Sequence, residues 1–193
     1  MPAKMKSGEK RVYQLKVTLR DISPPIWRRI LVPHDIRLDQ LHQVLQVVMG
    51  WTDSHLHEFI IDGVTYGDTS VDMEMSEDME NERSFRLHRV VPREKGKSGY
   101  VYDFGDYWEH EILVEKILPV ETGTHYPVCI TGKRACPPED CGGTSEYGEL
   151  LEALQDPSHP EHEAMFEWLP EDFSDSEKFD VDSVNRSLRG SQR

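Results

Sequence analysis

The chain has 193 residues, 37% of them hydrophobic and 30% charged, which indicates one globular core rather than a disordered chain. No apolar run approaches the roughly 20 residues of a membrane span, and no apolar stretch follows the basic N-terminus to make a secretory signal. The net charge of -14, from 36 acidic and 22 basic side chains, disfavours non-specific nucleic-acid binding, because that binding depends on lysine and arginine.

One folded unit is expected to take up nearly the whole chain. Residues 11–188 are predicted to form a single domain, with residues 1–10 and 189–193 as tails. Residues 11–22 and 26–32 alternate apolar and polar side chains, which is typical of half-buried strands. The Ser-Pro-Pro turn between them predicts a hairpin.

In the next segment the spacing of apolar residues changes from alternation to the period of a helix. Apolar residues recur at helical spacing over residues 38–49, and Gly50 stands where a left-handed C-cap belongs, so an amphipathic helix is predicted. His42 lies about 80° from the centre of the apolar stripe, which predicts a side chain at the boundary between core and solvent.

Alternation then returns in a histidine-containing strand. His55 and His57 share one face of a predicted strand that runs to Ile61 and turns at Asp62-Gly63. Residues 68–83 carry seven carboxylates without periodicity, which predicts a flexible, solvated loop.

The order of elements defines the fold class. Because the C-terminal third shows helical patterns, we expect an α+β fold. Its sheet is predicted to be mainly antiparallel and built from hairpins, with one N-terminal helix packed on it and a helical C-terminal third.

The stretch "VYDFGDYWEHEI", residues 101–112, raises the question of a site. A two-residue turn at Gly105-Asp106 places Asp103 and His110 on one largely apolar face, close enough to meet. An acid and an imidazole in contact are found in catalytic and metal sites, and they can equally hold strand register through a structural hydrogen bond.

Cysteines mark a second candidate loop. Three cysteines without a secretory signal favour the reducing cytoplasm over a disulfide framework. Cys136 and Cys141 are not at zinc-knuckle spacing, although the three cysteines with His125 offer the donors of a tetrahedral site. The loop leads into a helix whose first backbone N–H groups can receive an anion. Its candidate residues are Cys136, Pro137, Pro138, Cys141, Gly142 and Gly143.

Several long motifs occur in a familiar order: "LHQVLQVVMGWTDSHLHEF", "YDFGDYWEHEI", "KRACPPEDCGGTSEYGELLEAL", "DPSHPEHEAMFEWL" and "FDVDSVN". From Val12 to Leu188 the chain resembles the plasmid Orf3-like family. The resemblance implies a compact α+β domain, found on plasmids, beside mobile elements and in chromosomes, and it implies no established activity. Some members are labelled resolvase-like transposon passengers. Recombinase chemistry is not favoured here, because Ser23 precedes two prolines and the arginines are scattered.

The resemblance also marks residues typical of the family without giving them roles. They are His42, Gly50, Trp51, His55, His57, Phe59, Asp103, Phe104, Gly105, Asp106, Trp108, His110, Pro137, Pro138, Glu139, Asp140, Gly142, Gly143 and Tyr147.

Three functions stay open on the sequence. The first, favoured by the acidity and by Tyr100, Tyr102 and Tyr107 on the expected outer face of the hairpin, is a module that binds a protein or peptide partner. The second is a metal-assisted hydrolase, because a mixed N/O ligand set suits zinc, manganese or iron. Its candidate polar cluster is His42, His55, His57, Asp103, His110, Glu139 and Asp140.

The third function is nucleic-acid binding through Trp27, Arg28 and Arg29, a compact pair of arginines beside an aromatic ring. A strand with solvated arginines is the alternative reading of this stretch. The enzymatic hypothesis makes one demand on the fold: its candidate residues must converge on one concave surface.

Overall fold

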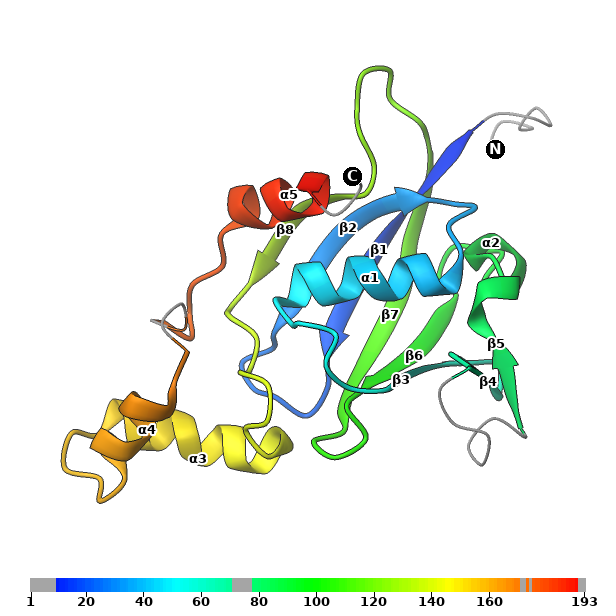
Figure 1. The fold of residues 1–193 in the computed structure, drawn as a ribbon. Coiled ribbons are helices and arrows are strands. Elements are labelled where there is room, and N and C mark those ends of the chain that lie inside the picture. The colour runs from blue at the N-terminus through cyan, green and yellow to red at the C-terminus, as the bar shows by residue number, and fades with distance from the viewer. Residues whose placement is uncertain (1–9, 71–77, 171–172, 174, 191–193) are drawn as a thin grey trace.

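The computed structural model describes residues 10–70, 78–170, 173 and 175–190. Within them eight strands form one sheet in the order β5-β4-β3-β6-β7-β1-β2-β8 (Figure 1). Neighbouring strands are antiparallel except β4 and β5, which run parallel. The strands are β1 (Arg11–Leu19), β2 (Trp27–Pro33), β3 (His57–Ile61), β4 (Val64–Gly67), β5 (Met79–Asn81), β6 (Lys97–Tyr102), β7 (Trp108–Pro119) and β8 (Val128–Lys133).

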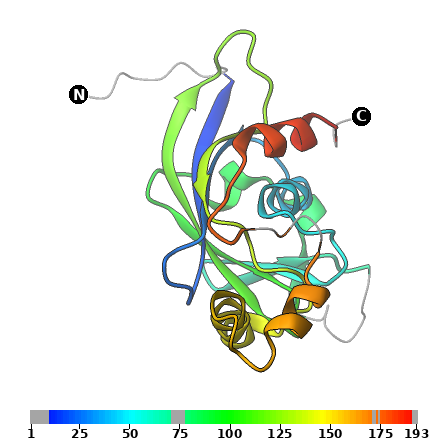
Figure 2. The same ribbon diagram turned by 90° about the vertical axis from the view of Figure 1, so that its left-hand side faces the viewer.

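Helices cover one face and one end of this sheet. The helices are α1 (Leu38–Met49), the 3-10 turn η1 (Glu82–Ser84), α2 (Leu87–Val90), α3 (Gly143–Gln155), α4 (His162–Trp168) and α5 (Val181–Gly190). Helices α1 and α5 contact each other on the same side of the sheet, and α3 packs with α4 at its end (Figure 2). No helix among the described residues is long and apolar enough to cross a bilayer. The expected single-domain α+β fold is confirmed.

The core lies between the sheet and α1. The alternation of β1 buries Leu15, Val17 and Leu19, which belong to the same hydrophobic core as Leu41 and Leu45 of α1. Each such side chain contributes on the order of 2 kcal/mol when it leaves water. The opposite face carries polar side chains, so the sheet has one wet and one dry face, as antiparallel sheets often do.

The hairpin between β6 and β7 differs from the prediction. Tyr102 pairs with Trp108 and Tyr100 with His110, so the connection is a five-residue loop, residues 103–107, instead of a two-residue turn. A shift of one residue in register exchanges the two faces of a strand. Tyr100 and Tyr102 therefore join Trp108 and His110 in the core, and the expected pairing of residue 103 with Trp108 is wrong.

Asp103 itself explains the wider loop. It adopts a left-handed φ of 59°, which aspartate tolerates better than most residues, and its Oδ1 accepts from the N–H of Gly105 at 2.9 Å. The side chain thus closes the loop on its own backbone and leaves the strand ladder.

Two other local predictions are corrected. The strand expected from His55 begins at His57. Of the acidic segment predicted as a solvated loop, residues 71–77 lie outside the described residues. Its last part forms β5 and η1, and Glu82 is buried there.

Candidate metal centre at the junction of three loops

Three segments that are distant in the sequence meet at one end of the sheet. They are residues 51–56 between α1 and β3, residues 103–107 between β6 and β7, and residues 137–142 before α3. These segments contain four of the seven residues of the candidate polar cluster: His55, Asp103, Glu139 and Asp140. Parts of three of the family-like motifs therefore build one region of the molecule.

Direct contacts join the three segments. The indole N–H of Trp51 donates to the carbonyl of Pro137 at 3.0 Å. The N–H of Gly142 donates to a carboxylate oxygen of Asp106 at 3.1 Å, and the backbone of Gly143 packs against the same residue. The anion expected at the start of α3 is thus supplied from within, by Asp106.

Tyr102 and Glu139 form a second connection. The Tyr102 hydroxyl accepts from the N–H of Ser54 at 3.0 Å and donates to Glu139, which also accepts from Thr52. Trp51 stacks on the Tyr102 ring, with centroids 4.9 Å apart. Burial first, and the Glu139 carboxylate second, raise the pKa of Tyr102, so the phenol stays protonated. These contacts fix the segment before β3 against the loop before α3.

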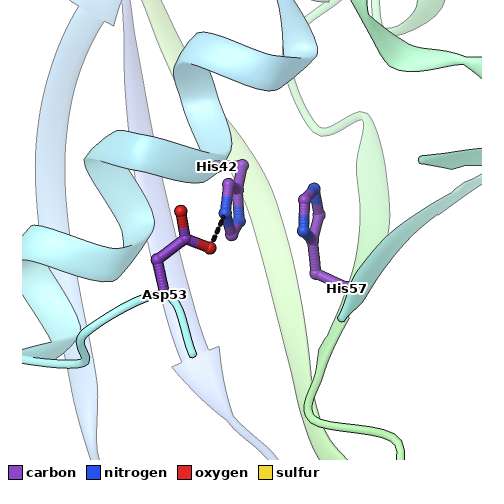
Figure 3. Close-up of side chains that lie close together, drawn as sticks. All are labelled: His42, Asp53 and His57. Atoms are coloured by element: carbon purple, nitrogen blue, oxygen red, sulfur yellow. Dashed lines mark hydrogen bonds and ion pairs between the residues drawn. The ribbon is translucent and has the colours of Figure 1, made fainter. Parts of the chain in front are cut away.

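One cluster of titratable side chains lies between α1 and β3 (Figure 3). The imidazole rings of His42 and His57 are stacked, with centroids 3.4 Å apart and planes 4° from parallel. His42 Nε2 lies 2.7 Å from Asp53 Oδ1, and His57 Nε2 lies 2.9 Å from Glu82 Oε2. Together with His55, these four side chains line a cavity of about 550 Å³.

The hydrogen bonds of His42 determine its tautomer. The Asp53 N–H donates to Gln46 Oε1 at 3.0 Å, which orients the amide so that Gln46 Nε2 donates to the Tyr100 hydroxyl at 3.0 Å. The Tyr100 hydroxyl proton is then directed to His42 Nδ1, 2.8 Å away, and Nε2–H of His42 donates to Asp53. Both ring nitrogens are engaged.

Electrostatics agree with a neutral His42. The residue is 2% exposed, so the prediction of a boundary position is wrong; the ring of His57 and the hydroxyl of Tyr100 cover it. Burial, and secondarily the neighbouring His57, lower the pKa of His42. Its pairing with Asp53 opposes this shift without overcoming it.

A second cluster lies where the three segments meet. His55 Nε2 is 3.1 Å from Asp140 Oδ1 and 3.7 Å from Asp103 Oδ2. The Asp103 side chain is 9% exposed and uses Oδ1 for its own loop, whereas Asp140 is 73% exposed. His55 Nε2 is buried and has no hydrogen-bond partner within the described part of the chain.

These distances approach those of ligands around a shared cation. Ligand atoms each about 2.1 Å from one ion lie roughly 3.0–3.4 Å from one another. The donor atoms of His55, Asp103 and Asp140 all lie within 4.8 Å of one another, and so do those of His42, Asp53 and His57. Both ring nitrogens of His42 already have hydrogen-bond partners, which leaves His55, Asp103 and Asp140 as the open ligand set.

His110 takes part in neither cluster. It is fully buried, its Nδ1 lies 3.2 Å from the Tyr100 carbonyl, and its Nε2 has no partner in the described structure. Burial lowers the pKa of His110 to about 4, so the ring is neutral. The expected contact between Asp103 and His110 is wrong, because the wider loop carries the aspartate to His55 instead.

The cysteines do not assemble a metal site. Neither group of potential ligands in the described residues contains a thiol or His125. Cys136 lies against the Arg28 guanidinium at 3.2 Å. Burial raises the pKa of Cys129 to about 11, and burial together with Asp106 raises that of Cys141 to about 12, so neither is an activated nucleophile.

The patch expected at residues 27–29 is not a basic surface. Arg28 is 1% exposed and donates to the carbonyls of Val48 and Lys133, both at 2.8 Å, so it is neither solvated nor available to phosphate. Arg29 forms two hydrogen bonds with Glu115, and Trp27 is half-buried beside it.

The aromatic surface expected for a binding module is also reduced. Tyr100 and Tyr102 are fully buried, and of the three tyrosines only Tyr107, 53% exposed, faces solvent.

The candidate residues divide as follows. His42, His55 and His57 line one cavity; Asp103 and Asp140 approach His55, and Glu139 supports the same junction through Tyr102. The sequence did not point to Asp53, Gln46 or Glu82. Asp53 stands in the "GWTDSHLH" motif and was available as a signal, whereas Glu82 is indistinguishable from its acidic neighbours.

Fold and site define a class: α+β proteins with a helix on one face of an antiparallel sheet and histidines and carboxylates gathered at one end. Residues 11–186 match the family described as plasmid pRiA4b ORF-3-like protein, and the chain belongs to that family.

Two relatives support this assignment. The chain is 41% identical over 178 residues to a protein of Sinorhizobium fredii named "Uncharacterized protein y4hQ", covering 92% of this chain and 90% of that protein. It also resembles the crystal structure of a protein of unknown function, MM3350, from Methanosarcina mazei Go1. That match has a TM-score of 0.82 and 39% identity, and covers 91% of this chain and 98% of the other.

Proposed function

We propose that this protein is a metal-assisted hydrolase whose divalent cation is held by His55, Asp103 and Asp140. One observation carries the proposal: the buried Nε2 of His55, which has no hydrogen-bond partner within the described structure, lies 3.1 Å from Asp140 Oδ1 and 3.7 Å from Oδ2 of the largely buried Asp103 carboxylate. A buried carboxylate costs several kcal/mol unless it is paired, and a cation between these atoms removes that cost.

The ligand set suits a catalytic rather than a structural ion. Three protein ligands leave a position for water or substrate, and exposed Asp140 marks the open side. One nitrogen and two carboxylate oxygens suit zinc, manganese or iron. A bound cation lowers the pKa of its water and supplies a nucleophile at neutral pH.

The neighbouring cavity supplies a proton acceptor and a place for substrate. His57, paired with Glu82, lines the same cavity as His55 and is suited to take a proton from an attacking water. Neutral His42 holds the His57 ring from its other face.

Activity tests this proposal. Protein purified without a His-tag is stripped with EDTA, reconstituted with Zn²⁺ or Mn²⁺, and assayed on p-nitrophenyl acetate and bis(p-nitrophenyl) phosphate. We expect metal-dependent turnover that His55→Ala loses and that Glu152→Gln, an exposed change on α3, retains. Wild-type rates no higher than those of His55→Ala on both esters contradict the hydrolase.

A further inference from the structure

A groove lies between α3 and α4, and the proposed hydrolytic site makes no use of its apolar lining. It encloses about 410 Å³ and has Leu150, Met165 and Trp168 on its floor. Its rim carries Glu146, Glu149 and Glu161. None of the described residues that line it is basic, so the three glutamates on the rim have no cation within the groove.

We propose that this groove binds a basic segment of a partner protein, one that presents a bulky apolar side chain between lysines or arginines. The apolar floor accepts the anchor, and the glutamates on the rim face the flanking cations. Trp168 is 46% exposed and Met165 is half-buried, and both residue types are common at peptide-binding surfaces.

Charge selects this occupant over the alternatives. Nucleic-acid phosphates meet repulsion at an acidic rim. A second copy of this chain, with a net charge of -14, brings like charge to the groove. A basic peptide gains both the apolar contact and the charge complementarity.

The groove also extends to the candidate metal centre, because Asp140 lines both. Docking does not rest on the proposed hydrolase, since the floor and the glutamate rim belong to α3, α4 and the turn before α4. Peptide binding is therefore measured in EDTA, which removes the metal of the proposed hydrolase, so that failure of docking is distinguished from failure of the hydrolase.

The probe is a fluorescein-labelled peptide that alternates pairs of lysines with pairs of leucines, followed by fluorescence anisotropy in 150 mM salt. We expect the double change Glu146→Lys and Glu149→Lys to weaken binding at least tenfold. The matched double change Glu152→Lys and Glu167→Lys alters the net charge by the same amount at exposed sites of α3 and α4 that do not line the groove. It should weaken binding less than threefold.

A second readout locates the peptide. Trp168 is the most exposed of the four tryptophans, so its emission should shift to the blue on binding, and Trp168→Phe should abolish the shift. Equal loss in both double variants, or equal binding of a peptide with serine in place of leucine, would show bulk charge attraction only and overturn the proposal.

Discussion

Two histidine clusters each include one residue of the segment before β3, Asp53 in one and His55 in the other, and they differ in how their polar atoms are satisfied. In the closed cluster, His42, Asp53 and His57, both nitrogens of His42 have hydrogen-bond partners. In the open cluster, His55, Asp103 and Asp140, the facing nitrogen and carboxylate oxygens are close without a good hydrogen bond between them.

The comparison shows that burial alone does not identify a ligand. His42 is the more buried histidine, yet its network holds the proton on Nε2, the nitrogen that faces Asp53. His55 is more exposed, but its Nε2 has no competing partner in the described residues. We assign a structural role to His42 and Asp53 of the closed cluster and cation binding to the open one.

The largest expected effect is on metal affinity at the open cluster. Asparagine at position 103 tolerates the left-handed φ and retains Oδ1 for the loop, but it removes the charge that a cation requires. Asp103→Asn should lower Zn²⁺ affinity by more than a hundredfold in isothermal titration calorimetry, with little change in thermal unfolding. Wild-type affinity in this variant would contradict the assignment.

The second effect concerns His110, a buried histidine with only one hydrogen-bonded nitrogen. Its pKa is about 4 when folded and about 6.5 when unfolded, so the unfolded chain takes up the proton first as the pH falls. The free energy of unfolding should therefore drop by about 3 kcal/mol between pH 7 and pH 4. Burial also lowers the pKa of His42, which acts in the same direction.

Urea titrations at several pH values measure this loss. His110→Gln retains a donor for the Tyr100 carbonyl and cannot titrate, so its stability should depend less on pH over that range. Identical slopes for the variant and the wild type would refute the role given to His110.

The third effect tests the closed cluster. Tyr100→Phe leaves His42 Nδ1 and Gln46 Nε2 without their partner in the core and should cost about 2 kcal/mol of unfolding free energy. Metal affinity should be unchanged. Tyr107→Phe, on an exposed ring, is the matched control and should cost less than 0.5 kcal/mol. Loss of metal affinity in Tyr100→Phe would instead show that the two clusters act as one metal site.

The smallest effect concerns the contact between loops. A Cβ at Gly143 would lie 2.7 Å from the carbonyl oxygen of Asp106, so Gly143→Ala should push the loops of Asp103 and Asp140 apart and lower metal affinity about tenfold. Gly63 has a similar positive φ, 81° against 82°, with nothing within 4 Å of a Cβ. Gly63→Ala should therefore preserve the affinity, and equal effects of the two changes would exclude a role for loop contact.

The sequence predicted the elements that local chemistry determines. Alternation located β1 and β2, helical spacing located α1, and Gly50 adopts the expected left-handed C-cap with φ 92°. The Asp62-Gly63 turn was also correct. In each case the signal lies within a few neighbouring residues.

The site depends on contacts that no local pattern contains. The boundary position predicted for His42 was wrong, because a helical projection omits the His57 ring that covers this side chain. The turn was misplaced because Asp103 can itself adopt a left-handed φ, so glycine was not needed for that step. Which histidine is free follows only from a network that joins α1, β6 and the loop between α1 and β3.

An anomalous difference map from crystals grown with zinc and recorded at the zinc edge tests the distinction between the clusters most directly. We expect a peak about 2.1 Å from His55 Nε2, Asp103 Oδ2 and Asp140 Oδ1. A peak bound by His42 and His57, or no peak at either cluster, would contradict it.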